Sequence, residues 1–436
     1  MTKKEEIMKR SRNRASTWVL VFFATAFVVS AGAAVPVATV TVNPGDIFVT
    51  DLLAFGGASG VIRVDPATGV ETPVSAGGFL VQPFGIAIEA SGNLVVADAS
   101  AFGGLCPGGC GGVVRVNPAT GAQSIVSTGG FFVDPFGIAI EADGKILVSD
   151  ASGLLIRVHP STGAQQIVSA AGFFASPTAL AVEASGTILV DDQLSGIIRV
   201  DPVTGTQTPL SPGGLFCGSL GLALEAGGDI LVTASPGCLA ARVVRVNPLT
   251  AAQSVVSAGG LFSLPFGLAV EAGGDILVVD PLAFGGPGGV IRVNPVTGAQ
   301  TPVPSGGLFV EPVGIAIART PQVITVAIDI TPGSLPNSIN PRNKGVIPVA
   351  ILTTNGFDAV TVDPVAVRFG PTGNEAVPVH SALEDVDGDG DIDLILHFRT
   401  QDTGIQCGAP SASLTGQTVS GQVIQGADSI RTVGCK

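Results

Sequence analysis

Residues 135–163 read PFGIAIEADGKILVSDASGLLIRVHPSTG, and the pattern of this segment predicts the fold. It contains three short runs rich in Ile, Val and Leu, separated by Gly, Pro and Asp residues that favour turns. A fourth run, AQQIVS, follows at residues 164–169. Short β-forming runs with turn residues between them predict four antiparallel strands within residues 135–169.

The same pattern recurs six times, with a period of 42 to 52 residues. Each unit holds an ILVxD strand, a variable loop, a VIRV strand, a turn of the type DPxTG, an AQxxVS strand, a Gly-rich loop and an FGIAIEA strand. The units begin at Gly45, Gly92, Gly144, Gly186, Gly228 and Gly274. Four strands per repeat is typical of propeller blades, so we predict an all-β, six-bladed β-propeller; a solenoid is the structural alternative.

The register of the repeats also predicts how the ring closes. Strands of the FGIAIEA type start at Phe84, Phe136, Thr178, Leu220, Phe266 and Val313. The first unit therefore lacks such a strand before it, and the last unit has one left over. We expect residues 314–318 to supply the inner strand of the blade whose other strands lie within residues 45–75, because this pairing removes the open sheet edges.

The composition is that of a folded β protein. The chain has 436 residues, of which 46% are hydrophobic and 13% are charged, with 60 Gly and 31 Pro. The aliphatic content argues against disorder, and the many Gly and Pro residues rule out a helical bundle. The formal net charge of −13 makes nucleic acids and anionic membranes unfavourable partners, because both require a basic surface.

The N-terminus predicts export. Basic residues among the first 14 positions precede an apolar run at residues 18–29, and small residues follow as far as Ala34. This order is typical of a secretory signal peptide, here residues 1–34, and an uncleaved N-terminal anchor is the alternative. We expect the mature chain to be secreted, or held at the cell surface or in the periplasm, without inserting into the membrane.

The cysteines agree with an oxidising compartment, because an even number in an exported chain favours disulfides. The Cys-Pro-Gly-Gly-Cys spacing at residues 106–110 could also suit a redox or metal pair, but no second pair or nearby His completes such a site. A bond between Cys217 and Cys238 is geometrically reasonable if their Cα atoms come within ~7 Å. The six cysteines are Cys106, Cys110, Cys217, Cys238, Cys407 and Cys435.

The repeats PFGIAIEADGKILVSD and LIRVHPSTG resemble the six-bladed propellers of the NHL-repeat and streptogramin-lyase (virginiamycin B lyase-like) type, over roughly residues 45–320. The resemblance implies either a His base with a metal, as in the lyases, or a carboxylate-rich metal site, as in lactonase-like propellers. His159 falls in a turn on the face opposite the usual active site, and His380 and His397 lie beyond the propeller. No residue matches the lyase base, so we predict no catalytic residue.

Five units end their second predicted strand in an Asp, and each unit has one Arg at the predicted start of its third strand. A ring of carboxylates near a channel could hold a metal, but we expect antiparallel pairing to bring each Arg back toward the Asp. A structural Asp–Arg pair or a turn cap is therefore the preferred interpretation, and a ligand role is the alternative. The residues are Asp51, Asp98, Asp150, Asp192 and Asp280, with Arg63, Arg115, Arg157, Arg199, Arg245 and Arg292.

A new pattern begins after residue 320. Runs such as VITVAIDI at residues 323–330 and GVIPVAIL at residues 345–352 predict a separate β domain over residues 321–436, of sandwich type. The propeller domain is expected at residues 35–320. The stretches IDITPGSLPNSINPRNKGVIPVAILTT and EDVDGDGDIDLILHFRTQDTGI resemble a C-terminal module that recurs in secreted bacterial proteins.

This predicted domain contains the clearest metal motif, DVDGDGDID at residues 385–393. Carboxylates at loop positions 1, 3, 5 and 9, with Gly at position 6, predict a Ca²⁺ loop in which position 7 offers its backbone carbonyl. Position 12 is Leu396 instead of the usual bidentate Glu, and the loop resembles those of dockerin and integrin-type repeats; the alternative is a solvated acidic turn. The predicted metal residues are Asp385, Asp387, Asp389, Asp391 and Asp393.

The functional prediction is an exported, monomeric, non-catalytic propeller that binds a protein or a glycan, with a calcium-stabilised C-terminal domain. The alternative is a metal-dependent lyase or lactonase. The interblade loops offer Gly and Phe, as in Gly78-Phe79, Gly130-Phe131-Phe132 and Phe173-Phe174. These Phe side chains could serve either interblade packing or a binding platform.

Overall fold

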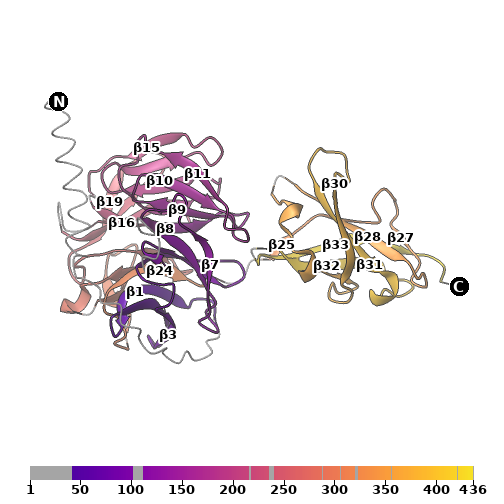
Figure 1. Cartoon of the computed structure of the whole chain (residues 1–436), viewed down its shortest axis with the longest axis horizontal. Coiled ribbons are helices and arrows are strands. Elements are labelled where there is room, and N and C mark those ends of the chain that lie inside the picture. The colour runs from indigo at the N-terminus through magenta and orange to yellow at the C-terminus, as the bar shows by residue number, and fades with distance from the viewer. Residues whose placement is uncertain are drawn as a thin grey trace. The chain divides into compact units, whose positions relative to one another are not determined.

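The computed structural model describes residues 42–101, 111–215, 218–234, 240–286, 288–304, 306–319, 323–354, 356–419 and 421–435. The predicted signal peptide and four of the cysteines, Cys106, Cys110, Cys217 and Cys238, lie outside these residues. The described chain is all-β (Figure 1), and it also contains the short 3-10 turns η2 (Ala283–Gly285), η3 (Ala359–Thr361), η4 (Pro364–Ala366) and η5 (Thr400–Asp402). Within these ranges no helix is long and apolar enough to cross a membrane.

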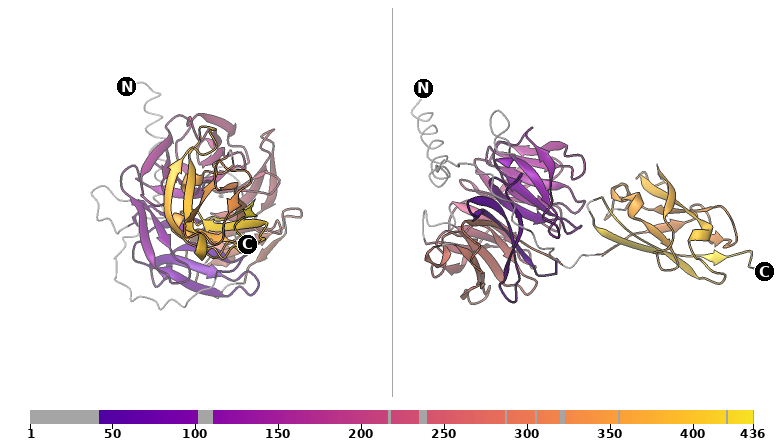
Figure 2. Two further views of the ribbon diagram at one scale, coloured as in Figure 1. Left: turned by 90° about the vertical axis from the view of Figure 1, so that its right-hand side faces the viewer. Right: turned by 60° about the horizontal axis from the view of Figure 1, so that its bottom comes forward.

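Six four-stranded antiparallel sheets follow one another around a ring, which confirms the predicted six-bladed propeller (Figure 2). Blade 1 contains β24 (Pro312–Ile317), β1 (Ile47–Phe55), β2 (Ala58–Val64) and β3 (Glu71–Ala76). Blade 2 contains β4 (Pro83–Ile88), β5 (Leu94–Asp98), β6 (Gly112–Val116) and β7 (Gln123–Thr128). Blade 3 contains β8 (Pro135–Ile140), β9 (Ile146–Asp150), β10 (Leu154–Val158) and β11 (Gln165–Ala170).

The remaining blades repeat this order from the inner to the outer strand. Blade 4 contains β12 (Pro177–Val182), β13 (Ile188–Asp192), β14 (Gly196–Val200) and β15 (Gln207–Ser211). Blade 5 contains β16 (Ser219–Leu224), β17 (Ile230–Ala234), β18 (Arg242–Val246) and β19 (Gln253–Ala258). Blade 6 contains β20 (Leu268–Val270), β21 (Ile276–Asp280), β22 (Gly289–Val293) and β23 (Gln300–Pro302).

The ring closes as the repeat register predicts. Strand β24 pairs with β1 through Ile47 opposite Ile317 and Thr50 opposite Gly314. In Figure 1 the orange β24 accordingly lies beside the indigo β1. The last inner strand along the chain therefore completes the first blade.

The blades are held together by apolar side chains on both faces of each sheet. All five residues of β9 are buried, because neighbouring blades cover the sheet from both sides. One core cluster joins Val95 and Ala97 of blade 2 to Ile146 and Val148 of blade 3.

The centre of the ring requires glycine. A Cβ atom on Gly137 would lie 2.2 Å from the carbonyl oxygen of Thr178 in the next blade. The Ser149 hydroxyl links the same two blades, since it accepts from the Gly137 N–H at 3.0 Å and donates to the Thr178 carbonyl at 2.6 Å. The inner strands are therefore packed more closely than any larger residue at Gly137 would permit.

At the rim, a glutamine latch links successive blades. In blade 3, the Gln165 amide donates to the Ser127 hydroxyl at 2.9 Å and to the Gly129 carbonyl at 3.0 Å. Its carbonyl oxygen accepts the Phe131 N–H at 2.7 Å. These partners lie at the end of blade 2 and in the loop that follows it. Equivalent latches are made by Gln123, Gln207, Gln253 and Gln300.

Residues 323–435 form the smaller sandwich-like body that the sequence predicts. One sheet contains β25 (Val323–Thr325), β33 (Val423–Ser429), β32 (Ser411–Gln417) and β29 (Arg368–Gly370). The other contains β26 (Ile328–Ile330), β28 (Val346–Ile351), β31 (Asp393–Arg399) and β30 (Pro378–Glu384), and β27 (Ser338–Ile339) pairs with β34 (Arg431–Thr432). Phe369 and Phe398, one from each sheet, meet in the shared core with ring centroids 5.0 Å apart.

A disulfide joins Cys407 to Cys435 in this body, with Cα atoms 5.8 Å apart. It ties the last described residue to the loop before β32. This bond accounts for one pair of the six cysteines.

Candidate functional site

The propeller has two faces built from different connections. The loop face consists of the interblade loops and the loops between second and third strands, such as residues 129–134 and 151–153. The turn face consists of the connections between first and second strands and between third and fourth strands, such as residues 141–145 and 159–164. In blade 3, Asp150 pairs with Leu154 at the loop face, and Val158 pairs with Ile146 at the turn face.

The ring of aspartates lies at the loop face and caps its loops. In blade 3, Asp150 accepts the N–H groups of Val133 at 2.8 Å, Asp134 at 3.0 Å and Ser152 at 2.9 Å. Backbone N–H groups are bound in the same way by Asp51, Asp98, Asp192 and Asp280. All five side chains are fully buried. The predicted turn cap is confirmed, and it occupies the carboxylate oxygens that a metal would need.

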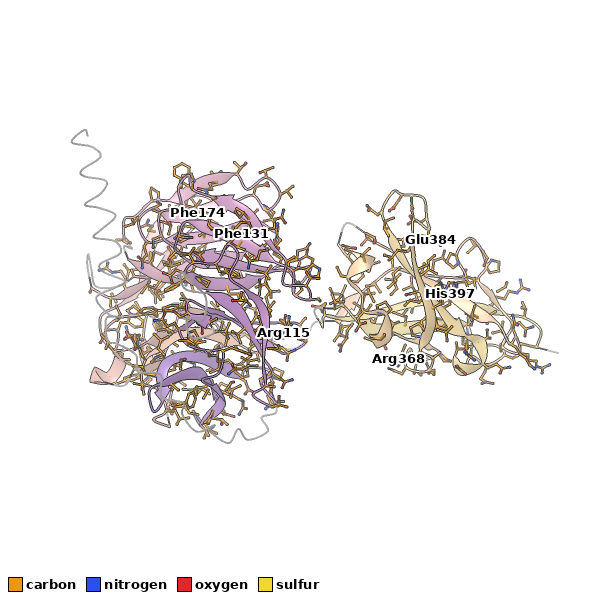
Figure 3. The ribbon with its side chains drawn as sticks, in the orientation of Figure 1. Arg115, Phe131, Phe174, Arg368, Glu384 and His397 are labelled. Atoms are coloured by element: carbon orange, nitrogen blue, oxygen red, sulfur yellow. A yellow bond between two sulfur atoms is a disulfide. The ribbon has the colours of Figure 1, made fainter. Side chains whose placement is uncertain are left out.

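The predicted Asp–Arg pair is wrong. Arg157 pairs with Leu147, near the start of β9, whereas Asp150 ends that strand. The Arg157 side chain therefore lies at the turn face, where its Nε and Nη2 atoms bind Glu141 at 2.5 and 2.6 Å. Its Nη2 also donates to the Pro202 carbonyl of the next blade at 3.0 Å. Arg115, labelled in Figure 3, binds Glu89 and Pro160 in the same manner.

These pairs repeat in every blade. Arg199, Arg245 and Arg292 bind Glu183, Glu225 and Glu271, and Arg63 binds Asp46. Sequence reasoning missed these acidic partners and the Gln latch, although the Glu of FGIAIEA and the Gln of AQxxVS recur at fixed places in the repeats. The recurrence was the available signal, and the strand register supplies its explanation.

The centre of the propeller contains a hollow of about 80 Å³. Its walls come from the beginning of the inner strands, as with Phe84, Phe136 and Thr178, and in blade 6 also from Phe266, which precedes β20. The rings of Phe84 and Phe136 stack with centroids 4.3 Å apart. None of the described residues that line the hollow carries a titratable side chain. The hollow therefore offers no acid or base for chemistry.

Behind this wall lies one unusual carboxylate, Asp191. The equivalent position carries the hydroxyls of Thr50, Ser149 and Thr233, which link neighbouring inner strands. Asp191 instead accepts from the Ser219 hydroxyl at 2.6 Å. Complete burial raises its pKa to about 7.

The histidines are placed as the sequence predicts. His159 lies in the turn between β10 and β11, and its Nδ1 accepts the N–H groups of Ser161 and Thr162 at 3.3 Å each. This imidazole caps a turn on the turn face. His380 and His397 lie in the C-terminal body on the paired strands β30 and β31, with ring centroids 5.4 Å apart (His397 is labelled in Figure 3).

The acidic loop connects β30 to β31. Ligand atoms of Asp385, Asp387 and Asp393 lie within 4.8 Å of one another, whereas Asp389 and Asp391 are outside this group. Asp393 is buried, and its two oxygens accept the N–H groups of Thr353 at 2.7 Å and Val386 at 2.9 Å. The Asp385 oxygens accept from Gly388 and Gly390, which wraps the loop around this carboxylate.

The loop thus gathers three of the five predicted metal residues. Asp387 and Asp389 each accept an N–H from two residues further along, at 3.2 and 2.9 Å, which holds the loop in successive tight turns. Carboxylate oxygens on such a loop are the ligands that Ca²⁺ prefers.

Comparisons with known proteins concern the fold. No protein-family model matches the sequence, and a search of curated proteins finds no match either. Among solved structures, the chain is similar to a chain in the crystal structure of a nidogen/laminin complex, with 13% identity, a TM-score of 0.51 and coverage of 62% of this chain and 97% of that chain.

Two bacterial enzymes are also similar. Virginiamycin B lyase from Staphylococcus aureus shares 13% identity, with a TM-score of 0.44 and coverage of 65% of this chain and 91% of that chain. The periplasmic gluconolactonase of Pseudomonas aeruginosa shares 15% identity, with a TM-score of 0.45 and coverage of 64% and 100%. At these identities the likeness concerns the propeller fold, which hosts many unrelated functions.

Proposed function

We propose that the chain is an exported, non-catalytic binding protein, in which the propeller binds a protein or a glycan and the C-terminal body is stabilised by Ca²⁺. The observation that carries the proposal is how the aspartates of the ring are buried and hydrogen-bonded. Its carboxylates are buried and hold backbone N–H groups, so they serve the loops that would face a ligand. The Cys407–Cys435 disulfide is compatible with export.

A metal-dependent lyase or lactonase would need several free carboxylates or a His base at the mouth of the hollow. Asp98 illustrates the obstacle, because it accepts from Val81 at 2.7 Å, Gln82 at 3.0 Å and Ser100 at 2.9 Å. Its burial raises its pKa to about 6, so ionising it in place is already costly. Releasing these oxygens to a metal would also leave three partly buried N–H groups without this partner.

For the C-terminal body, we propose that Asp385, Asp387, Asp389 and Asp393 bind Ca²⁺ through their carboxylates, and Asp391 through its backbone carbonyl. The clustering of three of these carboxylates supports the proposal. Because Leu396 stands at the position of the usual bidentate Glu, the dissociation constant should be on the order of 10⁻⁴ to 10⁻³ M. Such an affinity suits an extracellular module.

Calorimetric titration of the full chain with Ca²⁺ and, separately, with Zn²⁺ or Mn²⁺ tests both parts of the proposal. We expect one Ca²⁺ per chain, abolished by Asp385→Ala. Asp391→Ala is the matched control, because it removes the same charge from the same loop but leaves the backbone carbonyl. A transition-metal site that persists in Asp385→Ala would favour the enzyme alternative, and the absence of any Ca²⁺ binding would return the loop to a solvated turn.

A further inference from the structure

The loop face of the propeller carries exposed apolar side chains. Of the two Phe residues in each of two interblade loops, the second packs inward, and Phe132 and Phe174 are 3% and 6% exposed. The first points outward, and Phe131 and Phe173 are 43% and 48% exposed. Phe131 and Phe174, one from each loop, are labelled in Figure 3. The other exposed apolar residues of this face are Val133, Leu194, Leu282, Phe284 and Val310.

The outward residues are held in place by the Gln latch. The Phe131 N–H is bound by Gln165 at 2.7 Å, and the Phe173 N–H is bound by Gln207 at 2.6 Å. In addition, the Ser195 hydroxyl beside Leu194 donates to the Phe173 carbonyl at 2.7 Å. These bonds fix the backbone that carries both rings, so less backbone has to be ordered when a partner covers them.

The same face has almost no charge. Its described loops contain no Lys or Arg, and their only unburied carboxyls are Asp134 and Glu311. Burial raises the pKa of Asp134 to about 6 and also raises the pKa of Glu311. The charged residues gather on the turn face, where all the repeated Arg–Glu pairs lie. The loop face therefore exposes few charges, and the aspartates of its ring are buried.

The size of the central hollow restricts the ligand. At about 80 Å³ it is well below the ~300 Å³ of typical small-molecule pockets. Sugars are recognised through several polar side chains around an aromatic ring, and the described loop face offers few of these. Protein interfaces, in contrast, are rich in aromatic anchors and poor in charge at their centre.

From these observations we infer that the loop face binds another protein through an apolar contact surface that exposes few charges, with Phe131 and Phe173 as anchors. The inference rests on the proposed binding function and specifies its partner. The chain enters and leaves the propeller on the turn face, where Gly45 and Asp46 bond to Ala318.

The test uses a random dodecapeptide library, displayed on phage and selected on the immobilised full chain in Ca²⁺-containing buffer. We expect the selected peptides to have uncharged, apolar cores. The double variant Phe131→Asp/Phe173→Asp should weaken their binding by about tenfold or more. The matched control is Val203→Asp/Leu249→Asp on the turn face, where the side chains are 91% and 90% exposed; it should change binding less than twofold.

Thermal melts must show that both double variants remain folded, as expected for exposed positions. Peptides that bind both variants equally, or that share a charged consensus, would overturn the inference. Two parallel measurements separate it from the broader proposal. Saturable binding on a glycan array that is lost in Phe131→Asp/Phe173→Asp would support the proposed binding function. It would overturn the inference that the ligand is a protein. Sedimentation showing a dimer that dissociates in this variant would assign the face to a second copy of the chain.

Discussion

The Gln latch allows the cohesion between blades to be measured with a single substitution, Gln165→Ala. The substitution removes two hydrogen bonds donated by the side-chain amide, to Ser127 and Gly129, and one accepted from the Phe131 N–H. Each such bond contributes about 1 kcal/mol net. Because the site is half-buried, water recovers part of this, and we expect a loss of about 2 kcal/mol in the free energy of unfolding.

At roughly 2–4 °C per kcal/mol for a domain of this size, the melting temperature should fall by about 4–8 °C. Gln166→Ala is the control, because Gln166 is the next residue of the same strand, has the same side chain and is exposed. It should shift the melting temperature by no more than ~1–2 °C. Differential scanning calorimetry of the full chain measures both. Equal shifts for the two variants would refute the view that these latches hold neighbouring blades together.

Three further predictions concern the ring. In blade 1 the latch residue is Glu71. Burial raises the pKa of this carboxyl, and one of its oxygens has no partner among the described residues. Ionisation of Glu71 therefore lowers the stability of the fold as the pH rises above ~4.5, and Glu71→Gln should raise the melting temperature at pH 8 but not at pH 4. Gly137→Ala should lower the free energy of unfolding by ~1–3 kcal/mol in denaturant titrations, because the added Cβ would lie 2.2 Å from the Thr178 carbonyl oxygen. An unchanged free energy of unfolding would contradict the close packing of the inner strands. Truncation after Pro312 removes most of β24 and should abolish cooperative unfolding of the propeller, whereas truncation after Pro321 should preserve it. Identical thermal melts for the two truncated chains would contradict ring closure through β24.

Much of the propeller could be predicted because its information is local. Each blade is a meander of short strands joined by tight turns, and turn residues such as Gly144 and Gly163 adopt the positive φ that glycine tolerates. The repetition of this unit then implied the ring, and the leftover strand implied its closure. The calcium motif is local as well, since all its proposed ligands lie within nine residues.

The partners of the repeated side chains could not be predicted in this way. Whether Arg157 meets Asp150 or Glu141 depends on which end of the strand it occupies, and an error of a few residues moves it to the opposite face. Likewise, Phe131 and Phe132 are chemically identical in sequence, and only the path of the loop makes one a core residue and the other an exposed anchor.

The all-β class, the six blades, the strand that closes the ring and the acidic loop can be predicted from the amino-acid sequence, because they follow from turn chemistry and from a repeated pattern of β-forming residues. The three-dimensional structure was needed to choose the turn cap over the Asp–Arg pair for the Asp ring, and to show that the Arg–Glu pairs and the exposed Phe residues lie on opposite faces. The physical reason is that hydrogen-bond partners and surface exposure depend on strand register and blade packing, which bring together residues far apart in the chain.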